Sequence, residues 1–412
     1  MVVWASVAAV MTAPGQTAAV SVYTDPLIVS LGITRTELSI SYLVGTLLGA
    51  AAMPWVGRAL DRYGVRPVMA AIGLVFGGVL IGLGFVTSIV PLTAGFVGIR
   101  MCGQGALGLA ATTLVAVHTT RRRGLMLGIT AGIGSAGVSL APLLIERLVS
   151  GYGPQTAWVI EGLAVWAIVV PVALLGLRRL PRPRPLSADD VVDTATPRAT
   201  GGVWTPRTAA RTTMFWAVCA GLAASGMITT GLNFHQISLL GERGLSPVEA
   251  AANFIPQTVA AIAGTLLIGA FADIVAPKFG VALAMIALSA AMVCATVVSP
   301  GGAAIAYGLV LGLSGGAMRT IEAAAFAYYF GISNIGAIRG IATTVSVGST
   351  AFGPLVVSLG HDLAGNYGTA LLVLAPLPLA IALLAVLAPA PRPGEPSASG
   401  DRLAGESSAP VG

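Results

Sequence analysis

Residues 57–66 read GRALDRYGVR, and residues 269–278 read GAFADIVAPK. Each stretch follows a long apolar run, places an aspartate (Asp61 or Asp273) four residues after a glycine, and ends on a basic residue. The second stretch is a degraded copy of the first. A motif repeated at the same place in two parts of a chain predicts that the chain is built from two similar halves.

A second repeat supports this division. Arg123 is followed by a glycine and opens an apolar run that contains Pro142, and Arg339 opens a similar run that contains Pro354. Two similar halves around a central axis are the layout of an alternating-access transporter. In such a transporter the substrate site lies near the middle of the membrane, between the halves.

The composition excludes an ordinary soluble protein. Of the 412 residues, 56% are hydrophobic and only 9% are charged, and the mean hydropathy is +0.88. Soluble globular proteins carry about 25% charged residues. The three cysteines, Cys102, Cys219 and Cys294, lie inside apolar runs without CxxC spacing, which favours small apolar fillers over a metal or redox site.

Apolar runs recur along the chain, and each is long enough to cross a hydrocarbon core of about 30 Å as a helix of about 20 residues. They lie near residues 2–23, 37–57, 67–88, 91–117, 124–147, 156–177, 212–240, 247–271, 279–299, 303–330, 338–360 and 366–388. We therefore expect an all-α polytopic membrane protein with twelve transmembrane helices in two pseudo-symmetric six-helix bundles.

The stretch between the sixth and seventh runs is rich in proline and arginine and too poor in apolar residues to cross a membrane. It is expected to be a linker between the halves. The predicted parts are an N-terminal six-helix bundle at 1–177, a cytoplasmic linker at 178–211, a C-terminal six-helix bundle at 212–390, and a disordered cytoplasmic tail at 391–412.

The orientation follows from the basic residues, because lysine and arginine accumulate on the cytoplasmic side of membrane proteins. Most of the 22 lysines and arginines fall in segments that are cytoplasmic if the N-terminus is inside, and only Arg35, Arg147 and Arg243 fall in outward loops. We expect a multi-pass protein of the cytoplasmic (inner) membrane with both termini cytoplasmic. Its net charge of +6 then needs no nucleic-acid partner.

The stretch GRALDRYGVRP resembles the loop signature G-x-x-x-D-R-x-G-R-R of the major facilitator superfamily. Residues 118–128 and 329–340 resemble the entries to helices five and eleven of its monocarboxylate-transporter-like branch in bacteria, and residues 231–246 are similar to the exit of helix seven there. The resemblance implies the major facilitator fold, with a gating loop after helix two and a counterpart after helix eight. The gating residues are Gly57, Asp61, Arg62, Gly64, Arg66, Gly269 and Asp273.

In the gating loop, Asp61 can accept hydrogen bonds from a helix N-terminus or pair with an arginine, forming a latch that stabilises the outward-facing state. The alternative is that Arg58, Arg62 and Arg66 only anchor the loop at anionic headgroups. Two further acids, Asp25 and Glu37, flank the first outward loop as solvated groups or as an outer gate.

A charge at bilayer depth costs on the order of 3 kcal/mol, so it normally faces a cavity or a partner. The charges that we expect deep in the spans are Arg100 on helix four, and Arg319 and Glu322 on helix ten. In the superfamily that the chain resembles, helices one, four, seven and ten line the central cavity, which implies that these charges face it. Two cations facing one cavity favour an anionic substrate.

Each of these residues also has a structural alternative. Arg319 and Glu322 are spaced for an i,i+3 ion pair, or Arg319 binds the substrate anion while Glu322 accepts a proton. Arg100 and Gln104 are similar to the superfamily's R-x-x-Q-G motif, but they are separated by one extra residue. Arg100 either contacts the substrate or forms hydrogen bonds between helices. The same two interpretations apply to four uncharged candidates for substrate binding: Gln16, Thr17, Asn233 and His235.

The sequence thus predicts a secondary active transporter for a small organic anion, a monocarboxylate, working by alternating access and coupled to protons as a symporter. The alternative is proton-driven efflux of an amphipathic drug or metabolite. An enzyme is not expected, since HExxH, paired intramembrane aspartates, Ser/His pairing and a nucleotide-binding GxxxxGK[ST] are all missing. We expect no cofactor or metal, and a monomer whose partners are a small-molecule anion, protons and the lipid bilayer.

Overall fold

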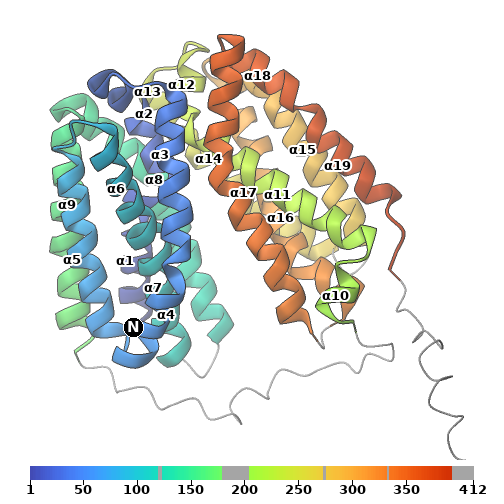
Figure 1. Cartoon of the computed structure of the whole chain (residues 1–412), viewed down its shortest axis with the longest axis horizontal. Helices are drawn as coiled ribbons and strands as arrows, with labels where there is room; N and C mark the ends of the chain where they lie inside the picture. Colours follow the sequence, from blue (N-terminus) through green and yellow to red (C-terminus); the bar gives the residue numbers. More distant parts are fainter. Residues whose placement is uncertain (119–122, 179–203, 272–274, 332–333, 392–412) are drawn as a thin grey trace, which may run out of the picture.

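The computed structural model describes residues 1–118, 123–178, 204–271, 275–331 and 334–391. Within these ranges every regular element is a helix, as the composition predicts. The helices form two groups that stand side by side (Figure 1). Most of the expected linker and tail, at 179–203 and 392–412, lies outside the described residues.

The chain before the linker forms the first group of helices. These are α1 (Val2–Val10), η1 (Ala13–Gly15), α2 (Thr17–Leu31), α3 (Arg35–Ala51), α4 (Met53–Tyr63), α5 (Val65–Leu83), α6 (Ile89–Ile99), η2 (Arg100–Leu107), α7 (Gly108–His118), α8 (Arg123–Tyr152), α9 (Pro154–Pro171) and η3 (Val172–Gly176).

The described chain from residue 204 onward forms the second group, and its first helix, α10, lies within the expected linker. These helices are α10 (Pro206–Ala209), α11 (Thr213–Phe234), α12 (Gln236–Gly241), α13 (Pro247–Ala252), α14 (Phe254–Phe271), α15 (Pro277–Val297), α16 (Gly302–Phe330), α17 (Ile335–Ala364), α18 (Tyr367–Leu374) and α19 (Pro376–Leu387).

Ten helical segments of the described chain are long and apolar enough to cross a membrane. The two further predicted spans, the first and the fourth, are each broken. The first consists of α1, η1 and α2, because Pro14 lacks the backbone N–H that a continuous helix needs. The fourth consists of α6, the π-helical segment η2 and α7. Counted with these, the spans agree with the predicted arrangement of six before and six after the linker.

The prediction of a gating loop after helix two was wrong in its secondary structure. Gly57, Asp61 and Arg62 lie in α4, which begins after a turn at Ala52, with Pro54 in its first turn, and continues the second span to Tyr63. Only Gly64 forms the turn, with a φ of 82° that favours glycine. The polar end of α4 therefore projects beyond the apolar run.

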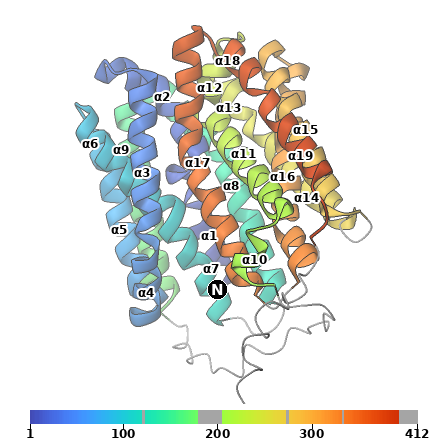
Figure 2. The ribbon, with the colours of Figure 1, turned by 45° about the vertical axis from the view of Figure 1, so that its right-hand side comes forward.

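The two ends of the molecule differ. One end, which we call the linker end, carries the N-terminus, the end of η3 and α10 (Figure 1). The opposite end carries the end of α2, the start of α3, and α12 and α13, and we call it the gate end because of the contacts between the two groups there (Figure 1). Towards the gate end the two groups touch, where α17 packs against α3, α11 against α2, and α8 against α13 and α14 (Figure 2). Ser139 of α8 and Thr258 of α14 are hydrogen-bonded across this contact.

Glycines allow the closest helix packing in the second group, between α14 and α16. A Cβ atom at Gly312 would overlap the carbonyl oxygen of Gln257, and one at Gly316 would overlap that of Ala261. Backbones can approach this closely only where a side chain is absent. The two helices therefore form one tightly packed unit.

We expect Gly312→Ala to lower the thermal stability of the purified protein in detergent. The added methyl group overlaps backbone that cannot move without separating α14 from α16, and overpacking of this kind costs about 1–3 kcal/mol. Gly315→Ala on the same helix is the matched control, because a Cβ there meets no atom within 4 Å. Equal melting temperatures for the two variants would contradict this account of the packing.

Candidate functional site

A cavity of about 540 Å³ lies between the two groups of helices, lined by residues of α1, α2, η2, α7, α8, α11, α14 and α16. Its volume is within the range of roughly 300–1,000 Å³ that is typical of small-molecule sites. The polar residues that line it are Thr12, Gln16, Thr17, Gln104, Thr112, Thr130, Ser135, Ser139, Thr229, Asn233, Gln257, Thr258 and Arg319.

Arg319 is the one charged side chain among the residues that line this cavity in the described chain. It is exposed to the cavity, and it makes no hydrogen bond or ion pair with any residue that the structure describes. Glu322 lies one turn further along α16, is half-buried, and is not part of the lining. The ion pair that the spacing of the two residues allows is not formed, so the guanidinium is available to a ligand.

Four other predicted substrate residues also line the cavity: Gln16, Thr17, Gln104 and Asn233. Thr17 is hydrogen-bonded to the Tyr42 hydroxyl at 2.6 Å, and Gln16 donates to Thr12 at 3.4 Å.

On the opposite wall, the Oδ1 atom of Asn233 and the Oγ1 atom of Thr229 are buried without a hydrogen-bond partner among the described residues. Both residues line the cavity, but these two atoms are themselves covered in this conformation.

Arg100, by contrast, is buried outside the cavity lining. Its Nε donates to Thr46 at 3.1 Å, its Nη1 donates to the carbonyl of Gly15 at 3.2 Å, and its guanidinium lies 4.7 Å from the ring centre of Tyr42. In this conformation it connects the fourth span to the second and to the break in the first. A role in substrate binding stays a prediction for Arg100.

The extra residue between Arg100 and Gln104 has a structural counterpart. Both residues lie in η2, a π-helical segment that holds one more residue per turn than an α-helix. The widened turn allows Arg100 to contact the first span while Gln104 faces the cavity.

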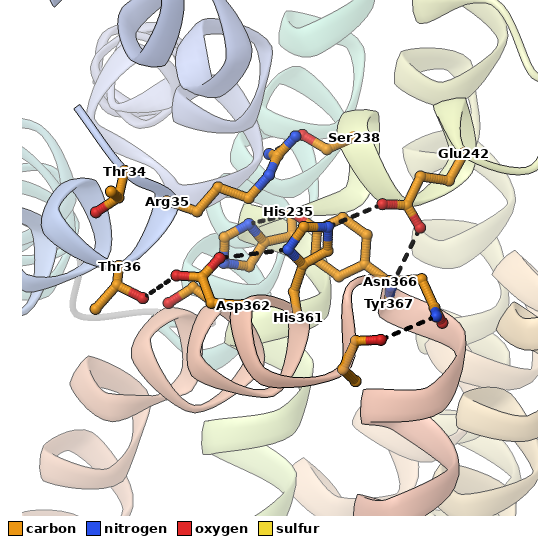
Figure 3. A network of polar contacts seen from close by, with 12 residues as sticks. Thr34, Arg35, Thr36, His235, Ser238, Glu242, His361, Asp362, Asn366 and Tyr367 are labelled. Atoms are coloured by element: carbon orange, nitrogen blue, oxygen red, sulfur yellow. Dashed lines mark hydrogen bonds and ion pairs between the residues drawn. The ribbon is translucent and has the colours of Figure 1, made fainter. Parts of the chain in front are cut away.

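The cavity is closed towards the gate end by a polar network between the two groups of helices (Figure 3). Arg35 donates to Asp25 at 2.8 Å and to Ser238 at 3.1 Å, and Ser238 donates to the other oxygen of Asp25 at 2.8 Å. Thr36 donates to Asp362 at 2.5 Å. Asp25, Arg35 and Thr36 belong to the first group and the other two residues to the second. We call these five residues the gate.

The gate is supported from the second group by His361 and Glu242, which are 3.0 Å apart (Figure 3). Glu242 also accepts from the backbone N–H of Tyr367 at 3.2 Å. His235, a predicted substrate residue, lies in this support: it is fully buried, 3.1 Å from the Tyr367 hydroxyl and 3.0 Å from the Pro354 carbonyl. It does not line the cavity.

Of the two acids near the first outward loop, only Asp25 belongs to the gate. Glu37 caps the N-terminus of α3, where its carboxylate accepts from the backbone and side chain of Thr34. The capping pattern, a threonine three residues before a glutamate, is readable from the sequence. The gate is not readable from the sequence, because its residues are far apart in the chain.

The predicted gating residues are not assembled in this conformation. Asp61 is exposed and makes no hydrogen bond or ion pair within the described ranges, and Arg62 lies 5.4 Å from the ring of its neighbour Tyr63. Arg66 donates to the carbonyl of Leu174 at 2.9 Å, within the first group. Gly269 lies in α14, and Asp273 lies outside the described residues. A latch at this end stays a prediction.

Two buried acids were missed by the sequence reasoning, which placed only Arg100, Arg319 and Glu322 deep in the spans. Glu161 of α9 and Glu146 of α8 are 6% and 5% exposed. Glu161 accepts a hydrogen bond from Tyr23, and Glu146 accepts one from Ser150 at 2.7 Å. Glu161 was identifiable, because it interrupts the apolar run of the sixth span.

A family model described as Major Facilitator Superfamily matches residues 5–259. The chain belongs to this superfamily. It is accordingly a membrane-embedded transporter of a small molecule and not an enzyme, as the sequence predicts.

Solved structures of a bacterial homolog to the human lysosomal transporter Spinster resemble the chain. In the inward-facing and unoccupied conformation, the TM-score is 0.69 at 15% identity, and 93% of this chain and 94% of that chain are covered. In the inward-facing and occupied conformation, the TM-score is 0.64 at 17% identity with the same coverage. At such identities the likeness supports the fold alone. A search of curated proteins found no match.

We expect a cleavable thiol crosslinker between Thr36→Cys and Asp362→Cys to stop transport, because the two side chains join the two groups of helices at the gate. Reduction of the linker should restore the activity to that of the untreated double variant. Each single cysteine variant, treated in the same way, is the control. Full transport in the crosslinked protein would show that the gate need not open.

Proposed function

We propose that the protein is a secondary active transporter that moves a small organic anion, a monocarboxylate, across the cytoplasmic membrane. The observation that carries this proposal is Arg319, the single charged group of the cavity lining within the described chain, exposed and without a protein partner. A guanidinium binds a carboxylate through charge-assisted, often bidentate hydrogen bonds. Gln16, Gln104 and Asn233 are positioned to bind the remaining polar atoms of such a substrate.

Alternating access is supported by the contrast between the two ends. The gate closes one end of the cavity. The other described hydrogen bonds between the two groups of helices, Ser139 with Thr258 and Thr24 with Phe234, lie between the middle of the molecule and the gate end. The positive-inside rule assigns the linker end, which carries most of the basic residues, to the cytoplasm. If both termini are cytoplasmic, as we propose, closure at the gate end supports an inward-facing state.

Proton coupling is the second part of the proposal. A proton that enters with a monoanion neutralises the transported pair, which lowers the cost of crossing the apolar middle of the membrane. Glu322, one turn from Arg319 on α16, is the proton acceptor that the sequence suggests. Glu322 is half-buried and lies on α16, a helix that lines the cavity, which is compatible with this role.

Efflux of an amphipathic drug or metabolite is the second candidate function. Apolar side chains of α14 and α16, including Phe254, Ile262 and Leu311, form part of the cavity wall and favour an apolar substrate body. An unpaired arginine disfavours a cationic drug, so an efflux substrate of this cavity would also be neutral or anionic.

We expect Arg319→Gln to reduce uptake of labelled lactate, pyruvate or benzoate into proteoliposomes at least about tenfold, because a buried charge-assisted hydrogen bond contributes about 1.5–3 kcal/mol. Arg319→Lys should retain part of the uptake. Arg147→Gln, at an exposed arginine of α8, is the matched control. Unchanged anion uptake in Arg319→Gln excludes this binding site, and dye efflux without any anion uptake favours the second function.

We expect an imposed gradient, acidic outside, to accelerate anion uptake by the wild-type protein. Glu322→Gln should lose this acceleration while still exchanging labelled for unlabelled anion, because exchange needs substrate binding but no net proton movement. Retained acceleration in Glu322→Gln would assign the proton to another group.

A further inference from the structure

Glu161 lies in a small polar cluster inside the first group of helices. Its Oε1 atom accepts a hydrogen bond from the hydroxyl of Tyr23. The Tyr23 ring stacks on Trp158 of α9, with ring centroids 3.7 Å apart and planes inclined by 16°. Tyr23, Trp158 and Glu161 are buried, and none of them lines the central cavity. The cluster is therefore separate from the proposed substrate site.

The cluster is deep within the span. Glu161 follows the start of α9 at Pro154 by two helical turns, which corresponds to about 10 Å at about 1.5 Å per residue. No ion pair joins it to any residue in the described part of the chain. An unpaired carboxylate in such surroundings is unfavourable, and the protonated acid is the form that removes the charge.

The elements packed around Glu161 supply no compensating cation. Helix α2 contributes Tyr23, and α8 contributes a second acid, Glu146, which is near enough to act on Tyr23 electrostatically. Helix α5 packs along α9, but its one charged residue is Arg66, which is bonded to Leu174 at the opposite end. Arg147, the neighbour of Glu146 on α8, is exposed, so the buried charge in this region is only negative, which favours an added proton.

Two polar atoms in the cluster are unpaired. The Oε2 atom of Glu161 and the Nε1 atom of Trp158 are buried without a hydrogen-bond partner among the described residues. Since buried polar groups are normally paired, each unpaired one needs an explanation. An oxygen of Glu161 that accepts no hydrogen bond is free to carry a proton itself.

Helix α2 connects this cluster to the gate. Tyr23 is followed directly by Thr24, which donates to the carbonyl of Phe234 in the second group at 3.4 Å, and then by Asp25 of the gate. A movement of α2 away from α9 would admit water to Glu161 and would also displace Thr24 and Asp25. Hydration of Glu161 and opening of the gate end are therefore one movement of the same helix.

We propose that Glu161 is a proton-binding site whose occupied form stabilises the closed gate. With the proton on Oε2, the cluster is neutral and Tyr23 of α2 can stay packed against Trp158 and Glu161 of α9. When the proton leaves to water, the carboxylate requires hydration and favours the open gate end. The inference rests on the alternating access of the proposed function but not on the identity of its substrate.

The test measures the gate directly, in the full-length protein in lipid nanodiscs without substrate. Spin labels at Val29→Cys and Leu363→Cys, which are 82% and 88% exposed at the gate end of the two groups, report the distance across it. The half-buried native thiol is removed by Cys294→Ser. The wild-type background should change from closed to open as the pH rises, and Glu161→Gln should stay closed over the whole range.

Glu146→Gln is the matched control, a buried acid on the adjacent helix, and it should keep the pH response. Tyr23→Phe should raise the pH midpoint by about one unit, because the hydroxyl that stabilises the carboxylate is lost. The proposal is overturned if the wild type shows no pH response, or if Glu161→Gln keeps the wild-type midpoint, which would assign the response to gate groups such as Asp25, Glu242, His361 or Asp362.

A second measurement covers the case in which Glu161→Gln does not fold. Infrared difference spectra of the wild type between low and high pH should contain the band of a protonated carboxylic acid, and Tyr23→Phe should shift that band. A spectrum unaffected by Tyr23→Phe overturns the assignment to Glu161. Because neither measurement uses substrate, a failure of anion uptake leaves both results interpretable.

Discussion

The guanidinium of Arg100 donates a hydrogen bond to the backbone carbonyl of Gly15 at the break in the first transmembrane span. Hydrocarbon offers no partner to a backbone carbonyl, so a helix interrupted within the membrane must find one in the protein. Arg100 donates to Gly15 at this break and to Thr46 of α3, and lies over the ring of Tyr42. The upper part of the first span, α2, can therefore have its own direction. Thr17 on the cavity wall, Tyr23 beside Glu161 and Asp25 in the gate all belong to α2.

Three sites thus depend on one short helix. The cavity, the buried acid cluster and the gate are separate in their contacts, but α2 passes each of them in turn. Glycines bring helices into backbone contact in both groups, as at Gly162 of α9 against α5 in the first and at Gly312 of α16 against α14 in the second. Tight helix packing within each group, together with the break in the first span, is a physical basis for movement of the two groups relative to each other.

The sequence was sufficient for the spans and for Arg319, because a hydrophobic run of sufficient length and a charge within it are local signals. It was not sufficient for Arg100, whose side chain is directed by the π-helical turn of η2. Glu161 carries the same local signal, a charge within an apolar run, but it lies on the sixth span, which the family resemblance does not assign to the cavity. His235 was placed near the substrate when it supports the gate, since helix periodicity alone does not show which neighbour a side chain meets.

The solitary position of Arg319 also has an electrical consequence. If the empty carrier reorients with an unpaired guanidinium in its cavity, one positive charge moves through part of the membrane field. A bound monocarboxylate cancels that charge, but the proton that enters with it restores it, so the loaded step moves the same charge in the opposite direction. A full traverse is worth about 2.3 kcal/mol per elementary charge for each 100 mV. Membrane voltage would then act on the empty and the loaded steps in opposite directions and leave the net transport of proton and anion unaffected.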